Sequence, residues 1–372
     1  MDNNRFIRLL VRNFLFWLSR KIDHPLVPAD ALQINFTFNC NLRCKMCSMH
    51  ERMESNKALN RPVDLDIDTI KKLIREGADM KVRSLILIGG EPFLEPRLFE
   101  LVAYGVSCGI TSITVVTNGT IMSEKLVEEM FKSRLSSLSV SIDASSEESF
   151  ARIRGQKYLA KIIANINLIN EMKEQRKENI PSICCVCTIM DQNLEELTGV
   201  IELCRQLKIG KIIFQPVVGD NTDQAKADAG SDVFVKPERF QVLDNAINAI
   251  IQYKKSSADN FDFIANSLQN LESIKKYLRG RSGAEKMNCY AGFNRIQIVQ
   301  EGKVYFCVKQ PEHEATFGDV KRDSLRSLWY SGRARVLRKL IRKCDKPCLQ
   351  WCSYRDDFDV IVAERQKSEL FK

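Results

Sequence analysis

The stretch "FNCNLRCKMC", residues 38–47, places three cysteines within eight residues: Cys40, Cys44 and Cys47, spaced C-x3-C-x2-C. A disulfide needs an even number of thiols, and a structural zinc site usually takes four ligands in two close pairs. Three thiolates from one short loop suit a cubane iron–sulfur cluster in which one iron keeps an open coordination position. A zinc or purely structural cluster is the alternative interpretation of this loop.

On both sides of the cysteine loop, short β-rich runs alternate with helical patterns. Such an alternation predicts a parallel α/β sheet, either open and doubly wound or closed into a partial barrel. In both architectures the chemistry gathers at the C-terminal ends of the strands, and the cysteine loop follows the first strand at that end. The predicted strands are 32–38, 84–89, 112–117, 137–143, 183–190 and 211–217, with helices at 66–78, 96–108, 123–133, 158–176, 193–208, 237–256 and 262–279.

Two further motifs follow the second and third predicted strands: "GGEP" at residues 89–92 and "TNG" at residues 117–119. Together with the cysteine triplet, and in this order, they resemble the radical S-adenosylmethionine (SAM) enzymes over about residues 30–220. The resemblance implies a partial (β/α)6 barrel of the TIM type. It also implies a 4Fe–4S cluster on Cys40, Cys44 and Cys47 whose open iron chelates SAM, and whose electron frees a 5′-deoxyadenosyl radical.

The same resemblance implies a set of SAM-binding residues. A carboxylate at a strand end is a natural acceptor for the ammonium of SAM, and the preceding glycines let a backbone approach closely. By motif match, a serine in "SVSID" and an arginine in "RIRG" hold the SAM carboxylate, although Arg152 competes for the second role. An ordinary strand-to-turn junction is the alternative for "GGEP". The predicted cofactor-binding residues are Gly89, Gly90, Glu91, Ser141 and Arg154.

The C-terminal region resembles the SPASM domain that follows many of these enzymes and holds auxiliary 4Fe–4S clusters. Two strand-like runs flank Glu301-Gly302 and predict a hairpin. The full SPASM pattern has seven cysteines for two clusters, whereas five here support one auxiliary cluster, as in the shortened "twitch" version. A zinc module is the alternative. The five candidate ligands are Cys289, Cys307, Cys344, Cys348 and Cys352, with the choice between Cys344 and Cys348 left open.

The remaining cysteines and one histidine have simpler interpretations. Alternation along the fifth predicted strand puts Cys185 and Cys187 on one face, where a free cysteine packs as a small apolar residue. The cysteines expected in the core are Cys108, Cys184, Cys185, Cys187 and Cys204. His50 lies next to the cysteine loop, where contact with SAM or substrate and simple exposure both remain open.

The formal net charge of +9 is unevenly distributed along the 372 residues. Residues 321–343 carry +8 and residues 1–22 carry +4, which leaves −3 for the rest of the chain. Because the positive charge is confined to two local segments, the protein as a whole is not basic, which argues against general nucleic-acid binding. Residues 3–22 predict an amphipathic helix that is too short to span a bilayer and either docks on the core or lies on a membrane surface.

The sequence thus predicts four parts: an N-terminal helix (1–30), the radical SAM barrel (31–220), a helical connector (221–284) and the auxiliary-cluster domain (285–372). Because the sequence shows no cleavable signal pattern, we expect a cytoplasmic enzyme, with peripheral membrane contact as an option. We expect a flavodoxin or ferredoxin to reduce it.

Only about 30 residues precede the first strand, and Val308 follows Cys307 where sulfatase-maturing relatives have an Asp. Both features favour hydrogen abstraction from a small, carbohydrate-like substrate, with oxidation or epimerisation as the outcome. The alternatives are a peptide-modifying maturase, a tRNA-modifying enzyme, and a non-catalytic iron–sulfur electron carrier.

Overall fold

The structure, a computed structural model, describes residues 3–58, 64–218, 233–280, 289–307, 316–343 and 349, with side chains from residue 7 onward. Its centre is a nine-stranded sheet in the order β6-β5-β4-β3-β2-β1-β7-β8-β9. The first six strands pair in parallel and in chain order, which confirms the predicted α/β architecture. They are β1 (Ala31–Asn35), β2 (Ser84–Ile88), β3 (Ser112–Thr117), β4 (Ser137–Ser141), β5 (Ser182–Ile189) and β6 (Lys211–Pro216).

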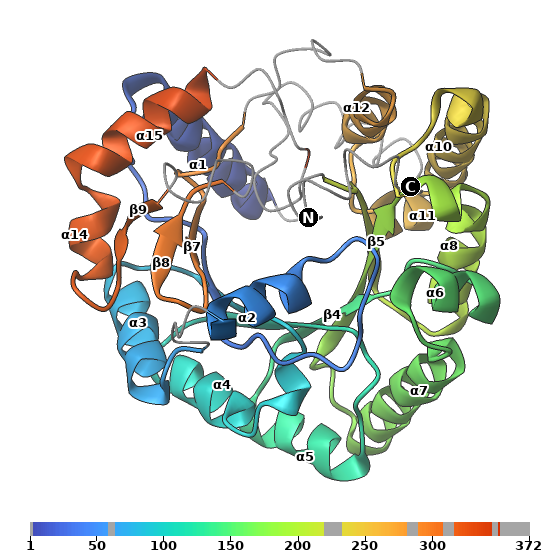
Figure 1. The fold of residues 1–372 in the computed structure, drawn as a ribbon, viewed down its shortest axis with the longest axis horizontal. Helices are drawn as coiled ribbons and strands as arrows, with labels where there is room; N and C mark the ends of the chain where they lie inside the picture. The colour runs from blue at the N-terminus through green and yellow to red at the C-terminus, as the bar shows by residue number, and fades with distance from the viewer. Residues whose placement is uncertain are drawn as a thin grey trace.

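Helices cover the outside of this curved sheet, as Figure 1 shows. Alternate residues of β3 and β5 are buried, and the apolar stripes of the helices pack against the strands. The predicted helices appear as α3 (Ile67–Asp79), α4 (Leu98–Ser107), α5 (Glu124–Ser133), α7 (Leu159–Arg176) and α8 (Leu197–Gln206). Helices that were not predicted are α2 (Met49–Ala58) and α6 (Glu147–Arg154), with the 3-10 turn η1 (Pro92–Leu94). The 3-10 turns η2 (Asp191–Glu196) and η4 (Pro237–Arg239) form the first turns of the helices predicted at 193–208 and 237–256.

Three helices follow the barrel strands: α10 (Phe240–Lys255), α11 (Ala258–Phe263) and α12 (Leu268–Leu278). The helix predicted at 262–279 is therefore interrupted. Its first residues instead bond to β6, where the Ala265 amide donates to Ile212 O at 2.9 Å and Asn266 exchanges two bonds with the Phe214 backbone. The free edge of β6 is thereby covered.

The C-terminal strands extend the same sheet beyond β1. Strand β7 (Arg295–Ile298) pairs in parallel with β1, and β8 (Lys303–Tyr305) and β9 (Thr316–Asp319) follow antiparallel. The β7–β8 pair confirms the predicted hairpin at Glu301-Gly302. The boundaries proposed at 220 and 284 remain predictions, and the sheet runs continuously across the second one.

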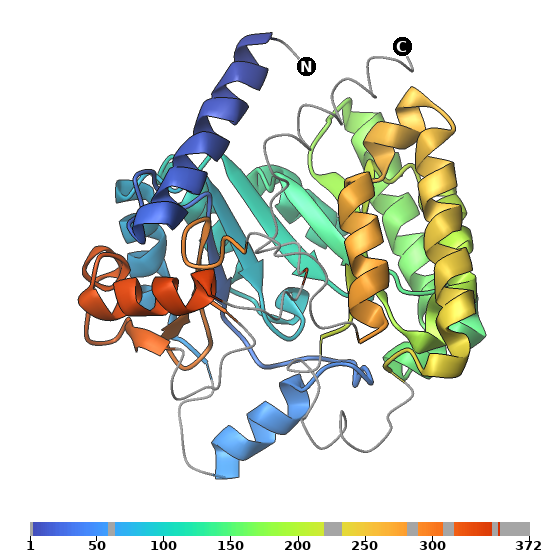
Figure 2. The same cartoon turned by 90° about the horizontal axis from the view of Figure 1, so that it is seen from above.

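Two helical segments lie side by side next to β8 and β9. Helix α1 (Asn3–Ile22) extends away from the body above α15 (Gly332–Arg342), which follows α14 (Leu325–Trp329), as Figures 1 and 2 show. Within the described residues, no helix is both long enough and apolar enough to cross a membrane.

Candidate functional site

The cysteine loop rests directly on the turn that follows β2. The amides of Gly90 and Glu91 donate to Thr37 O and Asn39 O at 2.8 and 2.7 Å. A Cβ on Gly89 would lie 2.4 Å from Thr37 O, and one on Gly90 would lie 2.2 Å from Asn39 O. The sequence predicted a close backbone approach at these two glycines, and the structure shows that the partner is the backbone of the cysteine loop.

Glu91 ties this turn to the next one along the sheet. Its carboxylate is completely buried, and Oε1 accepts from the Phe93 amide (3.0 Å) and from Thr117 Oγ1 (2.8 Å). Oε2 accepts from the Asn118 amide at 2.7 Å. Burial raises the pKa of Glu91, and these three hydrogen bonds oppose that rise. The turns after β2 and β3 are thus held as one unit.

Polar side chains fix the cysteine loop from two more directions. Asn118 Nδ2 donates to Asn41 Oδ1 at 2.9 Å, and Asn41 Nδ2 donates to Thr120 Oγ1 at 2.8 Å. On the other side, Asp64 Oδ1 accepts the Phe38 amide at 2.7 Å. The sequence signal for Asn118 was its place in the "TNG" motif, while Asp64 carried no signal beyond its charge.

Burial and neighbouring charges shift the ionisation of the three thiols of the loop. Burial raises the pKa of Cys44 to about 11, while the neighbouring Arg154 pulls it down and Cys47 and Cys40 push it further up. Burial raises the pKa of Cys40 and Cys47 as well. Because iron binds the thiolate form, cluster assembly must release the thiol protons.

This donor set fits a multi-iron cluster better than a single metal ion. Zinc gathers four ligands within about 2.3 Å of one centre, whereas a cubane spreads its thiolates over separate irons. Three cysteine thiols in the loop after β1, with no fourth in that loop, match the ligand set of a 4Fe–4S cluster with an open iron.

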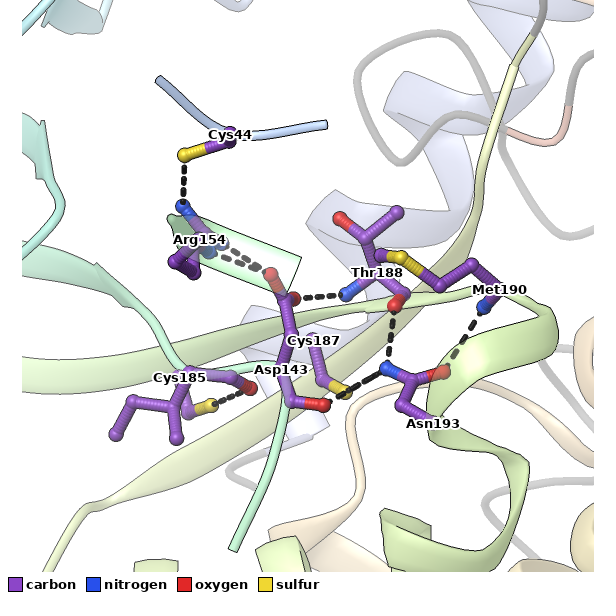
Figure 3. Close-up of polar contacts among 9 residues, drawn as sticks. Cys44, Asp143, Arg154, Cys185, Cys187, Thr188, Met190 and Asn193 are labelled. Atoms are coloured by element: carbon purple, nitrogen blue, oxygen red, sulfur yellow. Dashed lines mark hydrogen bonds and ion pairs between the residues drawn. The ribbon is translucent and has the colours of Figure 1, made fainter. Parts of the chain in front are cut away.

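Arg154, at the end of α6, brings a buried positive charge to the cysteine loop (Figure 3). Its Nε donates to Asp143 Oδ2 at 2.7 Å, and its Nη1 lies 3.8 Å from Cys44 Sγ. Burial lowers the pKa of Arg154, but the Asp143 carboxylate outweighs this and the net shift is upward. Arg152, the alternative from sequence, is exposed. Ser141 lies half-buried at the end of β4.

Asp143 was missed by the sequence reasoning, although it directly follows the β4 strand motif. Its Oδ1 accepts the Thr188 amide at 2.8 Å, and its carbonyl accepts from Asn193 Nδ2 at 2.8 Å (Figure 3). The ends of β4 and β5 are thereby joined behind the Arg154 guanidinium. The available signal was an acidic residue at the C-terminal end of a parallel strand.

Helix α6 is itself positioned by Glu196. This carboxylate accepts from the amide and hydroxyl of both Ser145 and Ser146, at 2.5–3.1 Å. Burial opposes ionisation, but the hydrogen bonds dominate and lower the pKa of Glu196 to about 2. The N-terminus of the helix that carries Arg154 is thus bound to an anion.

Of the predicted auxiliary ligands, the structure describes Cys289 and Cys307, both partly buried against the core. Cys344, Cys348 and Cys352 lie outside the described residues. The β7–β8 turn contacts the cysteine loop, because Gln300 Nε2 donates to Thr37 O at 3.1 Å. The buried cysteines that confirm the core prediction are Cys185, Cys187 and Cys204.

His50 is partly buried, and its Nε2 lies 2.6 Å from Leu42 O. The ring therefore braces the cysteine loop.

Comparisons with known proteins cover most of the chain. The radical SAM superfamily model matches residues 34–213, and the SPASM iron–sulfur cluster-binding domain matches residues 289–354. The AdoMet-dependent heme synthase of Methanosarcina barkeri is 28% identical over 308 residues, 82% of each chain. A probable GTP 3′,8-cyclase of Sulfurisphaera tokodaii is 24% identical, over 79% of this chain and 85% of its own.

Among solved structures, SuiB of Streptococcus suis has a similar fold. Its complex with S-adenosylmethionine superposes with a TM-score of 0.61 at 14% identity, covering 96% of this chain and 81% of its own. Its complex with the precursor peptide SuiA gives the same TM-score and identity, over 92% and 78%.

Proposed function

Because the chain belongs to the radical SAM superfamily and carries a SPASM domain, we propose that it abstracts hydrogen from a small, carbohydrate-like substrate and oxidises or epimerises it. The enzyme class, the SAM-binding 4Fe–4S cluster, the auxiliary cluster and SAM itself follow from the family. One observation supports this location of the site. The loop with three thiols is held at the C-terminal ends of β1 to β4 by the turns after β2 and β3.

We assign the cluster to Cys40, Cys44 and Cys47. When bound, the reduced cluster and SAM supply a 5′-deoxyadenosyl radical, and the chain supplies position and shelter from water. The buried bonds of Glu91 and Asp143 keep the strand-end turns rigid while this happens. Pre-organised turns matter because a radical must meet its target C–H bond before it meets solvent or the protein.

The residues that orient SAM are also proposals. Oε2 of Glu91 accepts one bond, from the Asn118 amide, so it has capacity to accept a second from the SAM ammonium. Arg154, already beside Cys44, is the cation that we assign to the SAM carboxylate, together with Ser141. The fixed guanidinium suits a carboxylate because it presents several N–H groups in one plane.

The auxiliary cluster would use four of the five C-terminal cysteines and pass an electron to or from the substrate radical. Cys289 and Cys307 lie in the segment that flanks and forms the β7–β8 hairpin, next to β1. A flavodoxin or ferredoxin is the proposed external reductant. Its binding surface is not assigned.

The substrate class is supported by the curated relatives. By name, they act on small molecules, and "GTP 3′,8-cyclase" refers to the 3′ position, which is a ribose carbon. A C–H bond beside a hydroxyl is weakened toward hydrogen abstraction, so sugars and cyclitols are suitable targets. A tetrapyrrole is a second candidate, favoured by the 28% identity with the heme synthase.

The experiment is an anaerobic incubation of the reconstituted, reduced enzyme with SAM in D2O. Nucleotide sugars, aminocyclitols, a tetrapyrrole and short Cys- or Ser-containing peptides are tested in parallel by mass spectrometry. Deuterium uptake or a loss of two mass units in a sugar or cyclitol is expected. Product confined to the peptides or to the tetrapyrrole would overturn the substrate proposal.

Two control arms address the other classes. A tRNA pool tests the nucleic-acid alternative, which the uneven charge disfavours. Release of 5′-deoxyadenosine with no substrate added separates an enzyme that cleaves SAM from a simple electron carrier.

A further inference from the structure

Exposed apolar side chains gather in two neighbouring segments of the described chain. Among the described residues, ten large apolar side chains are exposed, seven within residues 7–26 and three within residues 330–340. Single exposed apolar residues are normal on a protein surface, whereas a concentration in one place marks an interaction site.

Helix α1 docks through a mixed face, on which Phe16 is fully buried against Tyr290 and Phe293, and leaves most of its other large apolar side chains exposed. Toward the body, Arg12 Nε bonds Asp30 at 2.6 Å and Arg20 Nε donates to Cys289 O at 3.1 Å. Outward, Ile7, Val11 and Phe14 follow one another at helical spacing and are 55%, 53% and 52% exposed. A helix docked for stability usually buries its apolar stripe, whereas α1 buries Phe16 and leaves this second stripe exposed.

Helix α15 also exposes apolar side chains, although fewer than α1. Leu337 and Ile341 are buried, while Val336 and Leu340, one turn apart, are 56% and 53% exposed. Arg335 and Lys339 precede each of them in sequence and are exposed too. The outward side of α15 is therefore an apolar stripe bordered by positive charge.

The two helices meet at their C-terminal ends. Arg342 Nη1 donates to Lys21 O at 2.8 Å and pairs with Asp23 at 3.2 Å, and the His24 and Tyr330 rings are 5.8 Å apart. In Figures 1 and 2 the C-terminal end of α1 lies near α15, while its N-terminal end projects away from it. We define the α1–α15 surface as the exposed residues of segments 7–26 and 330–343.

From these observations we propose that the α1–α15 surface binds the face of an anionic lipid bilayer. The exposed charged residues of this surface are all cations, whereas the chain outside residues 1–22 and 321–343 carries −3. They are Arg8, Lys21, Arg333, Arg335, Lys339 and Lys343. Nearby acids are already engaged, Asp30 by Arg12 and Asp23 by Arg342. Apolar and aromatic side chains bordered by Lys and Arg are the composition of helices that lie in the membrane interface.

A bilayer fits this surface better than a second copy of the chain. Two copies meeting through it would bring like charges together, which costs energy at low salt. No helix of the described part can span the membrane, so the proposed binding is peripheral and reversible. Residues 3–22 were predicted either to dock on the core or to lie on a membrane surface. The two alternatives are compatible, because different faces of α1 contact the core and the proposed membrane.

The test is flotation of the reconstituted full-length enzyme with vesicles of equal parts phosphatidylcholine and phosphatidylglycerol, and with phosphatidylcholine alone. We expect binding to the anionic vesicles that weakens with salt, and little binding to the neutral ones. Phe14→Ser/Trp17→Ser and Val336→Ser/Leu340→Ser should each reduce binding about tenfold. The charge variant Arg335→Gln/Lys339→Gln should also weaken it, whereas the matched control Lys125→Gln/Lys161→Gln, on distant exposed helices, should not.

Three results would overturn the proposal. They are no flotation at low salt, flotation that all variants retain, and a concentration-dependent dimer in light scattering that Phe14→Ser/Trp17→Ser abolishes. The last would assign the surface to a second copy instead. Iron content and circular dichroism of each variant establish that it is folded, since the substituted side chains are exposed and outside the cysteine loop.

Discussion

Glu91 and Arg154 are buried charges that contact the turns around the cysteine loop. A buried charge is tolerated only when hydrogen bonds or an opposite charge replace the lost water. Glu91 has three donors from the chain, and Arg154 has Asp143. Each side chain therefore has a structural role in addition to the SAM contact proposed for it, and its variants must be assayed for both.

Glu91→Gln should weaken SAM binding and cleavage about tenfold while leaving the iron content unchanged. The exchange removes a charge-assisted acceptor and turns an NH2 group toward backbone donors, but touches no cluster ligand. Isothermal titration with SAM and an iron assay measure the two effects. Glu95→Gln is the matched control, because Glu95 pairs with Arg97 away from the buried turn. Loss of the cluster in Glu91→Gln would contradict this role.

Arg154→Met should lower the free energy of unfolding by about 3–5 kcal/mol, because Asp143 is left buried without its partner. It should also weaken SAM binding, if the guanidinium holds the SAM carboxylate. Arg152→Met makes the same chemical change at an exposed position and should do neither. Urea unfolding and SAM titration of the pair decide the matter. Equal effects of the two variants would leave Arg152 and Arg154 as equal candidates for binding the SAM carboxylate.

At the scale of elements, the site is an assembly of turns, each braced by the next. The turn after β2 supports the cysteine loop, the turn after β3 holds both through Glu91 and Asn118, and α6 approaches from the far side. Displacing one turn should therefore displace the thiols without any change to the cysteines themselves.

Gly90→Ala tests this bracing. A Cβ there would lie 2.2 Å from Asn39 O and 2.7 Å from Phe38 O, both backbone atoms that cannot rotate away. The cysteine loop must shift, and we expect loss of roughly half of the iron. Gly332→Ala is the control, since no atom lies within 4 Å of its added Cβ. A Gly90→Ala protein with full iron and normal SAM binding would contradict the proposed bracing.

The Glu196 brace of α6 makes a pH-dependent contribution to stability. Its folded pKa of about 2 lies below the ordinary value of 4.5, so the contribution is present above pH 4.5 and is lost as the pH falls toward 2. Glu196→Gln should therefore be destabilised at pH 7, by about 1 kcal/mol because the group is partly exposed, and match the wild type near pH 2. Urea unfolding at several pH values measures the difference. A difference that does not change with pH would refute the assignment.

The helices and strands differ in how far the sequence predicted them. The six strands were found because apolar runs and their turn motifs are local signals. Helix α2 was missed because its polar sequence has little amphipathic pattern, and α6 because it is only eight residues long. The interruption between α11 and α12 depends on tertiary bonds to β6, which no local pattern encodes.

The candidate site was likewise predicted only in part from the sequence. The cysteines and "GGEP" were identified by motif. The close backbone approach at Gly89 and Gly90 was predicted, but its partner was not. That partner and the roles of Asp64 and Asp143 arise from turns that are distant in sequence and meet only in the fold.

At the scale of the whole molecule, one sheet joins both halves of the chain. Strand β7 lies beside β1, so the segment with Cys289 and Cys307 is built onto the strand that leads into the cysteine loop. Gln300 bonds the loop directly. This continuity is a physical basis for an auxiliary cluster that exchanges electrons near the SAM site. It places the C-terminal segment in the same cooperative core as the barrel.

The central claim is that the loop of Cys40, Cys44 and Cys47 holds the cluster that cleaves SAM. The most direct test is 5′-deoxyadenosine release from SAM, under anaerobic conditions with dithionite, by the wild type and by the Cys40→Ala/Cys44→Ala/Cys47→Ala variant. The wild type should bind about eight irons and release 5′-deoxyadenosine, and the variant should keep about four irons and release none. Release by the variant, or none from a wild type with full iron, would contradict the account.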